Sequence, residues 1–349
     1  MTPTQRLTSA LACAVALAGT AMPAFAQSGE VNIYSYREPG LIQPLLDQFA
    51  VETGIKANVL FAGDGLLERV AAEGELSPVD VVLTVDVGNL VGAKEQGLTQ
   101  PITTPALTER LAPEFRDAEG HWAALSLRAR VFYVSKDRVE ATALTYEDIA
   151  KPEWNGRLCT RAGDHVYNIG LIASRIAAWG AEQTKEWLTA VRDNLAYAPG
   201  GGDREGVKNI LAGTCDLSIT NTYYMGHMLN NDAEPEQKEW AASARLVYPT
   251  TADGDGTQVN AAGAFIAKHA PNVENANRLI EFLLSDEAQQ IYADTNYEFP
   301  AVTSVKPAEL TLSWGELVPS KVTLSEVAQY RAEAAALVDE LKFNEGAQN

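Results

Sequence analysis

The chain has 349 residues, which is enough for two domains of ordinary size. Its formal net charge is −19 at pH 7, because 46 Asp and Glu residues outnumber 27 Lys and Arg residues. A surface with this charge repels nucleic acid and anionic lipid, so the composition excludes both as main partners. The acidic surface would favour a cationic ligand, but acidity is also a common route to solubility, and we prefer that explanation for the charge.

Residues 1–26 have the pattern of a secretory signal peptide. Arg6 supplies a positive charge, residues 7–22 are apolar and rich in alanine, and residues 24–26 (Ala-Phe-Ala) form a typical cleavage site. The apolar stretch is too short and too rich in alanine for a good membrane span, and we find no other candidate span. We therefore expect the mature chain to be exported and soluble, without direct insertion into a membrane.

Strand and helix patterns alternate after the cleavage site. The strands are alternating or continuously apolar runs, the helices have apolar residues at helical spacing, and Gly54 is suited to end the first helix. This β-α-β-α-β-α order predicts a doubly wound α/β domain. The predicted strands are 31–36, 56–61 and 79–84, and the predicted helices are 41–53, 65–73 and 87–96.

The remaining sequence predicts a second α/β lobe. A strand region at 122–134 carries Arg128 and Arg130. We expect the two doubly wound lobes to be joined by strands that cross near 126–130 and 261–264, and to close on a ligand by hinge motion. The predicted lobes are 27–127 plus about 264–310, and 128–263 plus about 311–349. The other predicted elements are strands at 157–161, 215–220 and 259–267, a turn and helix at 163–179, helices at 182–194, 205–212, 225–229, 275–284 and 286–295, and one long C-terminal helix at 325–343.

Two cysteines follow the signal peptide, Cys159 and Cys215. An even number of cysteines in an exported protein predicts a disulfide. Each cysteine lies in a strand-like segment next to a stretch that carries tyrosine, so the bridge would hold Tyr167 and the turn at 223–224 on one rigid frame. A zinc site is not expected, because the chain has no CxxC motif and its 4 His residues are scattered.

Tyr223 and Tyr224 come shortly after the predicted strand at 215–220. Adjacent residues on a strand point to opposite faces, so two neighbouring phenols converge only where the strand has ended. Asn221 and Thr222 are suitable turn and helix-capping residues, which places the pair at a strand-to-helix junction, where ligands bind in open α/β sheets. On the pair alone, we prefer the alternative that one Tyr packs inward and the other is solvated.

Tyr167 provides a third phenol near the start of the helix at 163–179. As phenolates, three tyrosines are hard oxygen donors that suit Fe³⁺ better than Zn²⁺ or Cu⁺, which prefer imidazole or thiolate ligands. Tyrosinate also ligates iron in some haem proteins. A bound cation would displace the phenol protons, whereas metal-free phenols should be neutral. The tyrosines therefore predict a ferric site if the fold brings them together.

Arg128 and Arg130 alternate along one predicted strand, so at least one of them can face the cleft. A guanidinium beside phenolates can balance their charge or hold a small anion that completes the coordination of the metal. The helix start at 163–166 could add backbone N–H groups to the same anion. His165 could be a ligand, but a His at a helix start is more often a capping or solvated residue, and we prefer that interpretation.

Other classes of function have weaker support. The run at 200–202 (Gly-Gly-Gly) lacks the spacing of a dinucleotide motif and the lysine of a P-loop, and no G-x-S-x-G motif occurs. We do not expect an enzyme: an iron-dependent oxidase is one alternative, but the sequence has no 2-His-1-carboxylate pattern and no second cofactor motif. The nearer alternative is a receptor for an organic cation or a small anion, with the tyrosines as a stacking or hydrogen-bonding wall.

Five short stretches, in the same order along essentially the whole mature chain, together resemble one known family. They are Val31-Asn32-Ile33-Tyr34-Ser35-Tyr36-Arg37, Gly74-Glu75-Leu76-Ser77-Pro78-Val79-Asp80-Val81, Arg128-Ala129-Arg130-Val131, Gly201-Gly202-Asp203-Arg204 and Asn221-Thr222-Tyr223-Tyr224. The double tyrosine with an upstream Tyr in a Gly-containing turn is the most specific part. The family that the chain resembles is the periplasmic ferric-ion-binding proteins of iron ABC transporters (the FbpA/FutA type).

This resemblance implies a bilobal type II periplasmic binding protein that holds a bare ferric ion in its cleft. It implies that Tyr167, Tyr223 and Tyr224 are the iron ligands. It also implies that Arg128 binds a synergistic anion, for which we expect carbonate or bicarbonate. Two other arginines of the quoted stretches are expected in the layer behind the ligands, namely Arg37 and Arg204.

The resemblance also implies a location and partners. The protein would act in the periplasm as a monomer and deliver iron to an inner-membrane ABC permease with its ATPase. Family members often add a His or Tyr ligand just after the Y-S-x-R stretch, whereas this chain has Glu38 and Pro39 there. Pro39 has no coordinating side chain, so Glu38 is the only candidate at these positions for a fourth protein ligand or an outer contact.

Overall fold

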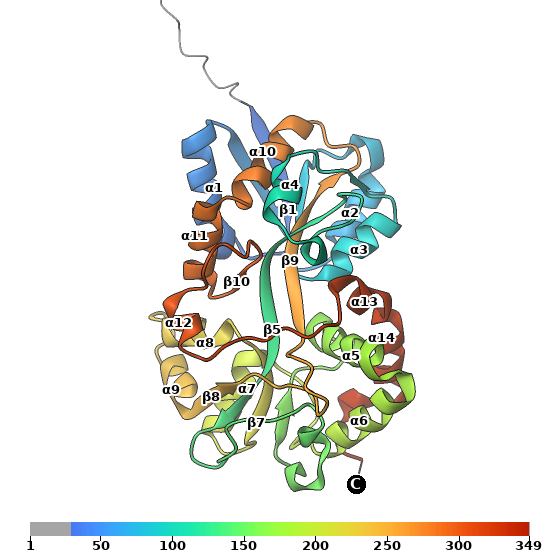
Figure 1. Ribbon diagram of the computed structural model, residues 1–349, viewed down its shortest axis with the longest axis vertical. Coiled ribbons are helices and arrows are strands. Elements are labelled where there is room, and N and C mark those ends of the chain that lie inside the picture. The colour runs from blue at the N-terminus through green and yellow to red at the C-terminus, as the bar shows by residue number, and fades with distance from the viewer. Residues whose placement is uncertain (1–28, 349) are drawn as a thin grey trace, which may run out of the picture.

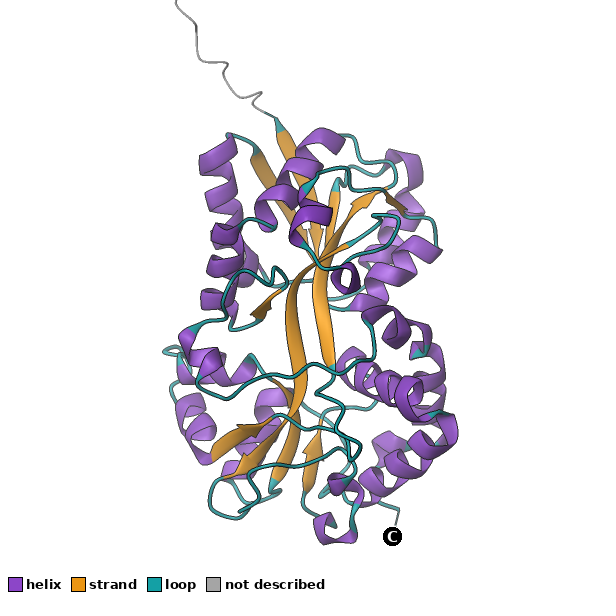
Figure 2. Cartoon of the chain, in the orientation of Figure 1, coloured by secondary structure: helices purple, strands orange, loops and turns teal. Residues whose placement is uncertain are grey.

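The computed structural model describes residues 29–348, so the predicted signal peptide at 1–26 lies outside the described residues. The described chain forms two lobes stacked along the long axis, and the strands β5 (Ala123–Ser135) and β9 (Val259–Ala267) run from one lobe to the other (Figure 1). Helices flank the strands in both lobes (Figure 2). The predicted fold class, an α/β protein with two lobes joined by crossing strands, is confirmed.

The first lobe is built on three parallel strands, as the alternating sequence predicts. β1 (Glu30–Ser35) lies between β2 (Lys56–Phe61) and β3 (Val81–Thr84) and pairs with both in parallel. Gly54 ends the first helix in the left-handed conformation that glycine tolerates, with φ of 71°. The helices that connect these strands are α1 (Pro39–Thr53), α2 (Leu66–Glu73) and α3 (Val87–Glu95).

β5 and β9 are shared by the sheets of the two lobes. Residues 123–129 of β5 pair antiparallel with β9, and residues 130–134 pair antiparallel with β7 (Leu217–Asn221). β9 continues into the first lobe, where it pairs with β3. The change of partner on β5 falls between Ala129 and Arg130, within the crossing predicted from the sequence. This change places two arginines of β5 at the junction of the lobes.

The second lobe surrounds the parallel strands β6 (Leu158–Thr160) and β7. Its elements agree with the predicted ones to within a few residues, but the segment at 236–247 was not predicted to have regular structure. The remaining elements of this lobe are α5 (Val166–Trp179), α6 (Ala181–Asp193), α7 (Asp203–Leu211), α8 (Tyr224–Leu229), α9 (Glu236–Ser243) and β8 (Ala244–Val247).

The prediction of one long helix at 325–343 is wrong. The segment forms two helices, α13 (Leu324–Gln329) and α14 (Arg331–Glu340), separated at Tyr330. α13 contacts both α3 of the first lobe and α5 of the second, whereas α14 packs on α5. The break redirects the chain between these two surfaces, and no Gly or Pro marks it in the sequence.

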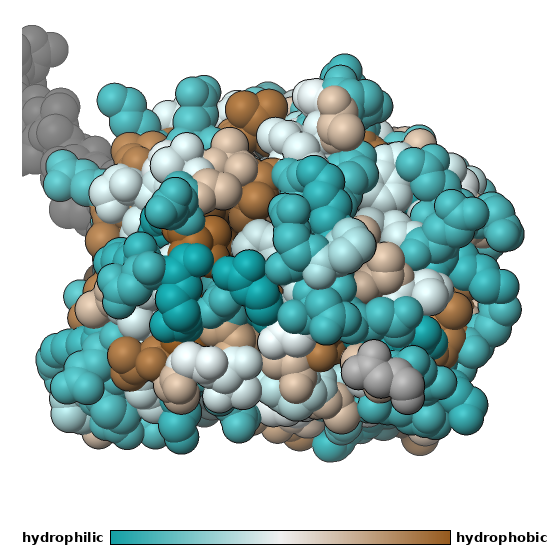
Figure 3. All heavy atoms as spheres, turned by 90° about the horizontal axis from the view of Figure 1, so that it is seen from below, coloured by the Kyte–Doolittle hydropathy of each residue, from teal (hydrophilic) through white to brown (hydrophobic). Residues whose placement is uncertain are grey.

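The lobe boundaries predicted from the sequence stay predictions. The remaining helices and strands are short or lie at the periphery. These elements are β4 (Thr99–Gln100), β10 (Phe299–Pro300), α4 (Ala106–Arg110), α10 (Val273–Leu283), α11 (Asp286–Asn296) and α12 (Glu309–Leu312). Among residues 29–348, every helix is too short or too polar to cross a membrane. The end of the second lobe presents a mostly hydrophilic face, in line with the acidic composition (Figure 3).

The predicted disulfide between Cys159 and Cys215 is present. The two residues are separated by 56 positions in the sequence, and their Cα atoms lie 5.9 Å apart. Cys159 belongs to β6, and Cys215 lies just before β7. The bridge therefore links the strand that leads toward Tyr167 to the strand that leads toward Tyr223.

Removal of this bridge should destabilise the second lobe. A cross-link that closes a loop of this length restricts the unfolded chain, so the double variant Cys159→Ala/Cys215→Ala should lose about 4 kcal/mol of unfolding free energy. Denaturant unfolding with and without a reductant measures the loss. The cysteine-free variant serves as the control, because reductant should leave it unchanged. Equal unfolding free energies for the oxidised protein and the variant would contradict the prediction.

Candidate metal centre

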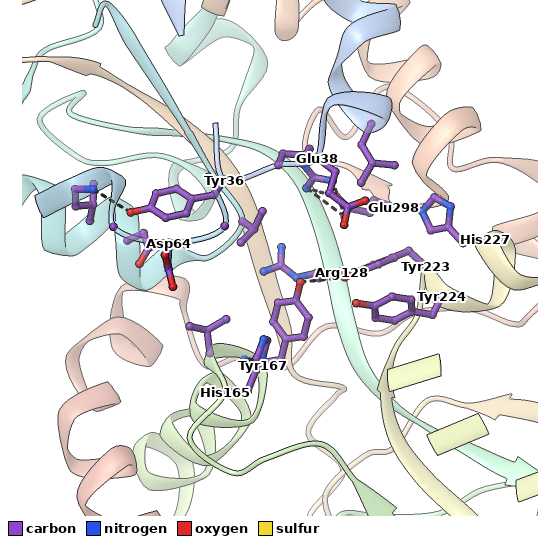
Figure 4. Close-up of a pocket in the computed structure, with 18 of the residues that line it drawn as sticks. Tyr36, Glu38, Asp64, Arg128, His165, Tyr167, Tyr223, Tyr224, His227 and Glu298 are labelled. Carbon is purple, nitrogen blue, oxygen red and sulfur yellow. Dashed lines mark hydrogen bonds and ion pairs between the residues drawn. The ribbon is translucent and has the colours of Figure 1, made fainter. Parts of the chain in front are cut away.

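A cleft of about 640 Å³ lies between the lobes. Residues of both lobes line it, so a molecule bound there would contact both (Figure 4). The lining from the first lobe includes Tyr36, Glu38, Asp64 and Asn89. The second lobe contributes His165, Tyr167, Arg204, Tyr223, Tyr224 and His227, and Arg37, Arg128 and Glu298 also line the cleft.

Tyr223 and Tyr224 lie where β7 ends and α8 begins, as predicted. Tyr223 precedes α8, and Tyr224 is its first residue. The hydroxyl of Tyr133 donates to the backbone oxygens of Asn221 (3.1 Å) and Thr222 (2.9 Å), which holds the turn in place. The two rings then lie side by side, with centroids 4.4 Å apart. Because the strand has ended, both phenols reach the same cleft.

Tyr167 comes from the first turn of α5 and meets the pair. Its hydroxyl is 3.1 Å from the hydroxyl of Tyr223. His165 caps the helix, because its Nδ1 accepts the backbone N–H of Tyr167 at 3.2 Å. The capping interpretation of His165 is therefore confirmed, although its ring also lines the cleft. The fold thus gathers all three predicted tyrosines on one wall of the cleft (Figure 4).

The phenols of the pair are held in their neutral form. Burial raises the pKa of Tyr223 well above its usual value, and the neighbouring Tyr167 and Tyr224 raise it further. Burial also raises the pKa of Tyr224, with added effects of Tyr167 and Asp203. Clustered phenolates repel one another, so both phenols of the pair carry their protons at neutral pH.

Arg128 faces the cleft with free donors. It is only 2% exposed, and both terminal nitrogens of its guanidinium are buried without a hydrogen-bond partner in the described part of the chain. Its guanidinium carbon lies 5.2 Å from the centroid of the Tyr167 ring. Arg130, two positions further along β5, instead forms a buried ion pair with Asp203 at 2.5 Å. Buried unpaired guanidinium donors beside a cleft are suited to an anion.

Arg37 and Arg204 occupy different positions around the cleft. Arg37 forms a buried ion pair with Glu298 at 3.2 Å, so its charge is already balanced. Arg204 lies over the ring of Tyr224, with 5.4 Å between the guanidinium carbon and the ring centroid. Glu38 lines the cleft from the first lobe and is exposed.

Sequence reasoning missed Glu298, Asp64 and His227. Glu298 accepts a hydrogen bond from Ser126 and is buried. Its burial alone would raise its pKa, but Arg37 and Arg128 more than offset this and hold the pKa below its usual value. The carboxylate is therefore ionised at neutral pH and adds negative charge to the wall of the cleft. No local pattern indicates Glu298, because its partner Arg37 is 261 positions away.

His227 did have a sequence signal. It follows Tyr223 by four positions, and residues with this spacing share one face of a helix. Its ring centroid lies 5.8 Å from that of Tyr223. Burial and the charge of Arg204 lower the pKa of His227 to about 4, so the imidazole is neutral at pH 7. Asp64 lies between two glycines and gave no comparable signal.

The donors in the cleft favour a hard cation. Within residues 29–348, no group of three or more His, Cys, Asp or Glu side chains is arranged to hold a metal. The cleft instead brings together the phenols of Tyr167, Tyr223 and Tyr224, and phenolate oxygen suits trivalent cations better than zinc or copper(I). A protein with this fold and this cleft is a two-lobed binding protein that closes on a small ligand.

Comparisons with known proteins agree with this class. The family described as bacterial extracellular solute-binding proteins matches residues 77–319. Iron uptake protein A1 of Synechocystis sp. is 37% identical, over 89% of this chain and 86% of the relative. The Fe(3+)-binding periplasmic protein of Serratia marcescens is 27% identical, over 89% of this chain and 88% of the relative.

Solved structures of ferric-binding proteins are also similar to this chain. Apo ferric ion-binding protein A of Pasteurella haemolytica has a TM-score of 0.86 and 43% identity, covering 91% of this chain and 99% of that one. Apo FutA2 of Synechocystis PCC6803 has a TM-score of 0.84 and 35% identity, covering 91% of this chain and 100% of that one. The chain belongs to the bacterial extracellular solute-binding proteins, in the group formed by the ferric-ion-binding proteins. The resemblance found in the sequence is confirmed, and these relatives are named as binding and uptake proteins rather than enzymes.

Proposed function

We propose that the protein captures ferric iron in the periplasm and delivers it to an ABC permease with its ATPase. Iron would bind in the cleft through Tyr167, Tyr223 and Tyr224. The observation on which this proposal rests is the 3.1 Å contact between the hydroxyls of Tyr167 and Tyr223, with the ring of Tyr224 tilted against that of Tyr223 at 4.4 Å between centroids. The names of the relatives, which include iron uptake and ferric-binding proteins, support the same solute.

The charges of the site fit a ferric ion with a small anion. Three phenolates balance Fe³⁺, so a dianion such as carbonate needs a separate positive partner. Arg128 offers two buried donors that find no hydrogen-bond partner among residues 29–348, and a planar guanidinium binds a planar carboxylate-like anion through two parallel hydrogen bonds. A bidentate carbonate and three phenolates leave one position of a six-coordinate ion for water or Glu38.

Release follows from the same chemistry. Protonation of the phenolates, loss of the anion or reduction to Fe²⁺ would each weaken binding, because phenolates hold the softer and less charged ferrous ion less tightly. Opening of the two lobes at β5 and β9 would expose the ion to the permease. The protein acts as a monomer in this scheme, since one chain supplies every proposed ligand.

The Arg128→Gln variant tests the role of the anion. The affinity of the wild-type protein for ferric ion should rise with added bicarbonate, whereas that of the variant should respond only weakly. In bicarbonate buffer the variant should bind ferric ion with an affinity about 10–100-fold lower, as expected when an outer partner of a metal site is removed. Competition with a chromogenic chelator measures both. Arg278→Gln, which removes an exposed ion pair with Glu274, is the control and should behave as wild type. A variant that keeps the full bicarbonate response would refute the assignment of Arg128.

A further inference from the structure

Asp203, the first residue of α7, contacts one of the chain segments that carry the tyrosines. Its side chain is 0% exposed and lies 2.5 Å from Arg130 Nη1. The same carboxylate oxygen accepts the backbone N–H of Asn221 at 3.0 Å. Asn221 is the last residue of β7, two positions before Tyr223. The carboxylate therefore fixes the end of the strand from which the tyrosine pair projects.

Arg130 extends this contact to the segment of Tyr167. Its Nε and Nη2 both donate to Asn168 Oδ1, at 3.3 and 2.8 Å. Asn168 Nδ2 donates in turn to Thr160 Oγ1 at 3.0 Å and to the backbone oxygen of Arg161 at 2.9 Å. Because Asn168 follows Tyr167 directly, a continuous chain of buried contacts joins both tyrosine segments to one carboxylate.

Asp203 also balances positive charge around Tyr167. The guanidinium carbons of Arg161, Arg128 and Arg130 lie 5.0, 5.2 and 5.9 Å from the centroid of the Tyr167 ring. Asp203 forms ion pairs with Arg130 and Arg161, at 2.5 and 3.6 Å. Of the three guanidiniums, only that of Arg128 has both terminal nitrogens buried without a hydrogen-bond partner within residues 29–348. The carboxylate thus engages two of the cations and leaves the third to face the cleft.

We propose that Asp203 is a positioning residue that sets the separation of Tyr167 and Tyr223 and keeps Arg130 and Arg161 from competing for the anion. Asp203 and Arg130 are not among the residues that line the cleft, so Asp203 acts through the tyrosines rather than by touching the ligand. The effect on iron rests on the ferric-binding function proposed above. The effect on tyrosine geometry concerns the metal-free protein and stands independently of that function.

The Asp203→Asn variant removes the charge and keeps the size of the side chain. In a crystal structure of the metal-free variant, the 3.1 Å contact between the Tyr167 and Tyr223 hydroxyls should be lost. Ferric affinity should fall about 10–100-fold, the range typical of an outer partner of a metal site. The phenolate-to-iron absorption band should also shift, which a loss of stability alone would not cause.

Asp80→Asn is the matched control. Asp80 is also buried, at 0% exposure against 2% for Asp203, and accepts the backbone N–H groups of Asn32 (2.7 Å) and Asn272 (2.6 Å), which are not in the segments that carry the tyrosines. Its substitution should lower thermal stability without changing the tyrosine contact, the iron affinity or the band. A second variant, Arg130→Gln/Asp203→Asn, removes both charges of the buried ion pair, so that no unpaired charge of this pair stays buried. It provides the test if Asp203→Asn fails to fold.

The results separate the two proposals. A folded Asp203 variant that keeps both the hydroxyl contact and wild-type iron affinity would overturn the positioning role. If the wild-type protein binds no ferric ion, the proposed function fails, and the metal-free structures of the variants still decide whether Asp203 positions the tyrosines. Loss of the contact in the Asp203 variants and its retention in Asp80→Asn would support the role.

Discussion

Replacement of Tyr223 or Tyr224 by phenylalanine should weaken and shift the visible phenolate-to-iron absorption band at neutral pH, because one of the three proposed phenolate ligands is lost. The substitution removes one anionic oxygen and leaves a ring of nearly the same shape, so the wall of the cleft stays packed. The affinity for ferric ion should fall by more than the roughly 10–100-fold typical of outer partners, because the lost group is a ligand itself. Absorption spectroscopy and chelator competition measure the two effects.

Tyr197→Phe is the control for these variants. Tyr197 is also partly buried, and its hydroxyl accepts a 2.6 Å hydrogen bond from Asn209, but it does not line the cleft. This variant should keep both the band and the affinity. Unchanged colour and unchanged affinity in both Tyr223→Phe and Tyr224→Phe would eliminate the tyrosines as ligands.

Acidification should release the iron steeply. Burial raises the pKa of Tyr223 and that of Tyr224, so both phenols of the metal-free protein carry protons at neutral pH. In the proposed iron complex the ligands are phenolates, so binding would expel these protons, and the affinity should fall as the pH falls. If all three tyrosines ligate iron, the binding constant should drop by about 1,000-fold for each unit of pH, since each displaced proton contributes a factor of ten.

Proton release measured in weakly buffered solution tests this coupling directly. Addition of ferric ion as a chelate of known proton content should release about three protons from the tyrosines, and any proton lost by bicarbonate adds to them. Tyr223→Phe should release one proton fewer than wild type if it still binds iron at the high protein concentration used. A ferric affinity that does not change across neutral pH would contradict phenolate ligation.

The sequence predicts the local structure of this protein well where local signals are strong. The predicted strands 56–61 and 259–267 have the same bounds in the structure as β2 and β9, because both are short apolar or alternating runs. Asn221 and Thr222 correctly indicated the end of β7, which put Tyr223 at the start of a helix. These features depend on neighbours in the chain, and a single sequence contains that information.

Contacts between distant segments are harder to predict. Glu298 reaches Arg37 across 261 positions, and Asp203 reaches Arg130 across 73 positions, with no periodic pattern to link either pair. The C-terminal helix likewise divides at Tyr330 without a Gly or Pro to mark the break, and the two parts contact α3 and α5, which are distant in the sequence. The sequence therefore indicated the tyrosines, Arg128 and Glu38, whereas the contacts of Glu298 and Asp203 emerged only from the fold.

The absorption spectrum of the purified protein, with and without ferric ion and bicarbonate, tests the central claim most directly. We expect a colourless metal-free protein that gains an intense visible band when one equivalent of ferric ion is added in bicarbonate buffer. The band should fade on reduction of the iron or on acidification. A protein that stays colourless and binds no ferric ion under these conditions would contradict the account and favour a receptor for an organic cation or a small anion.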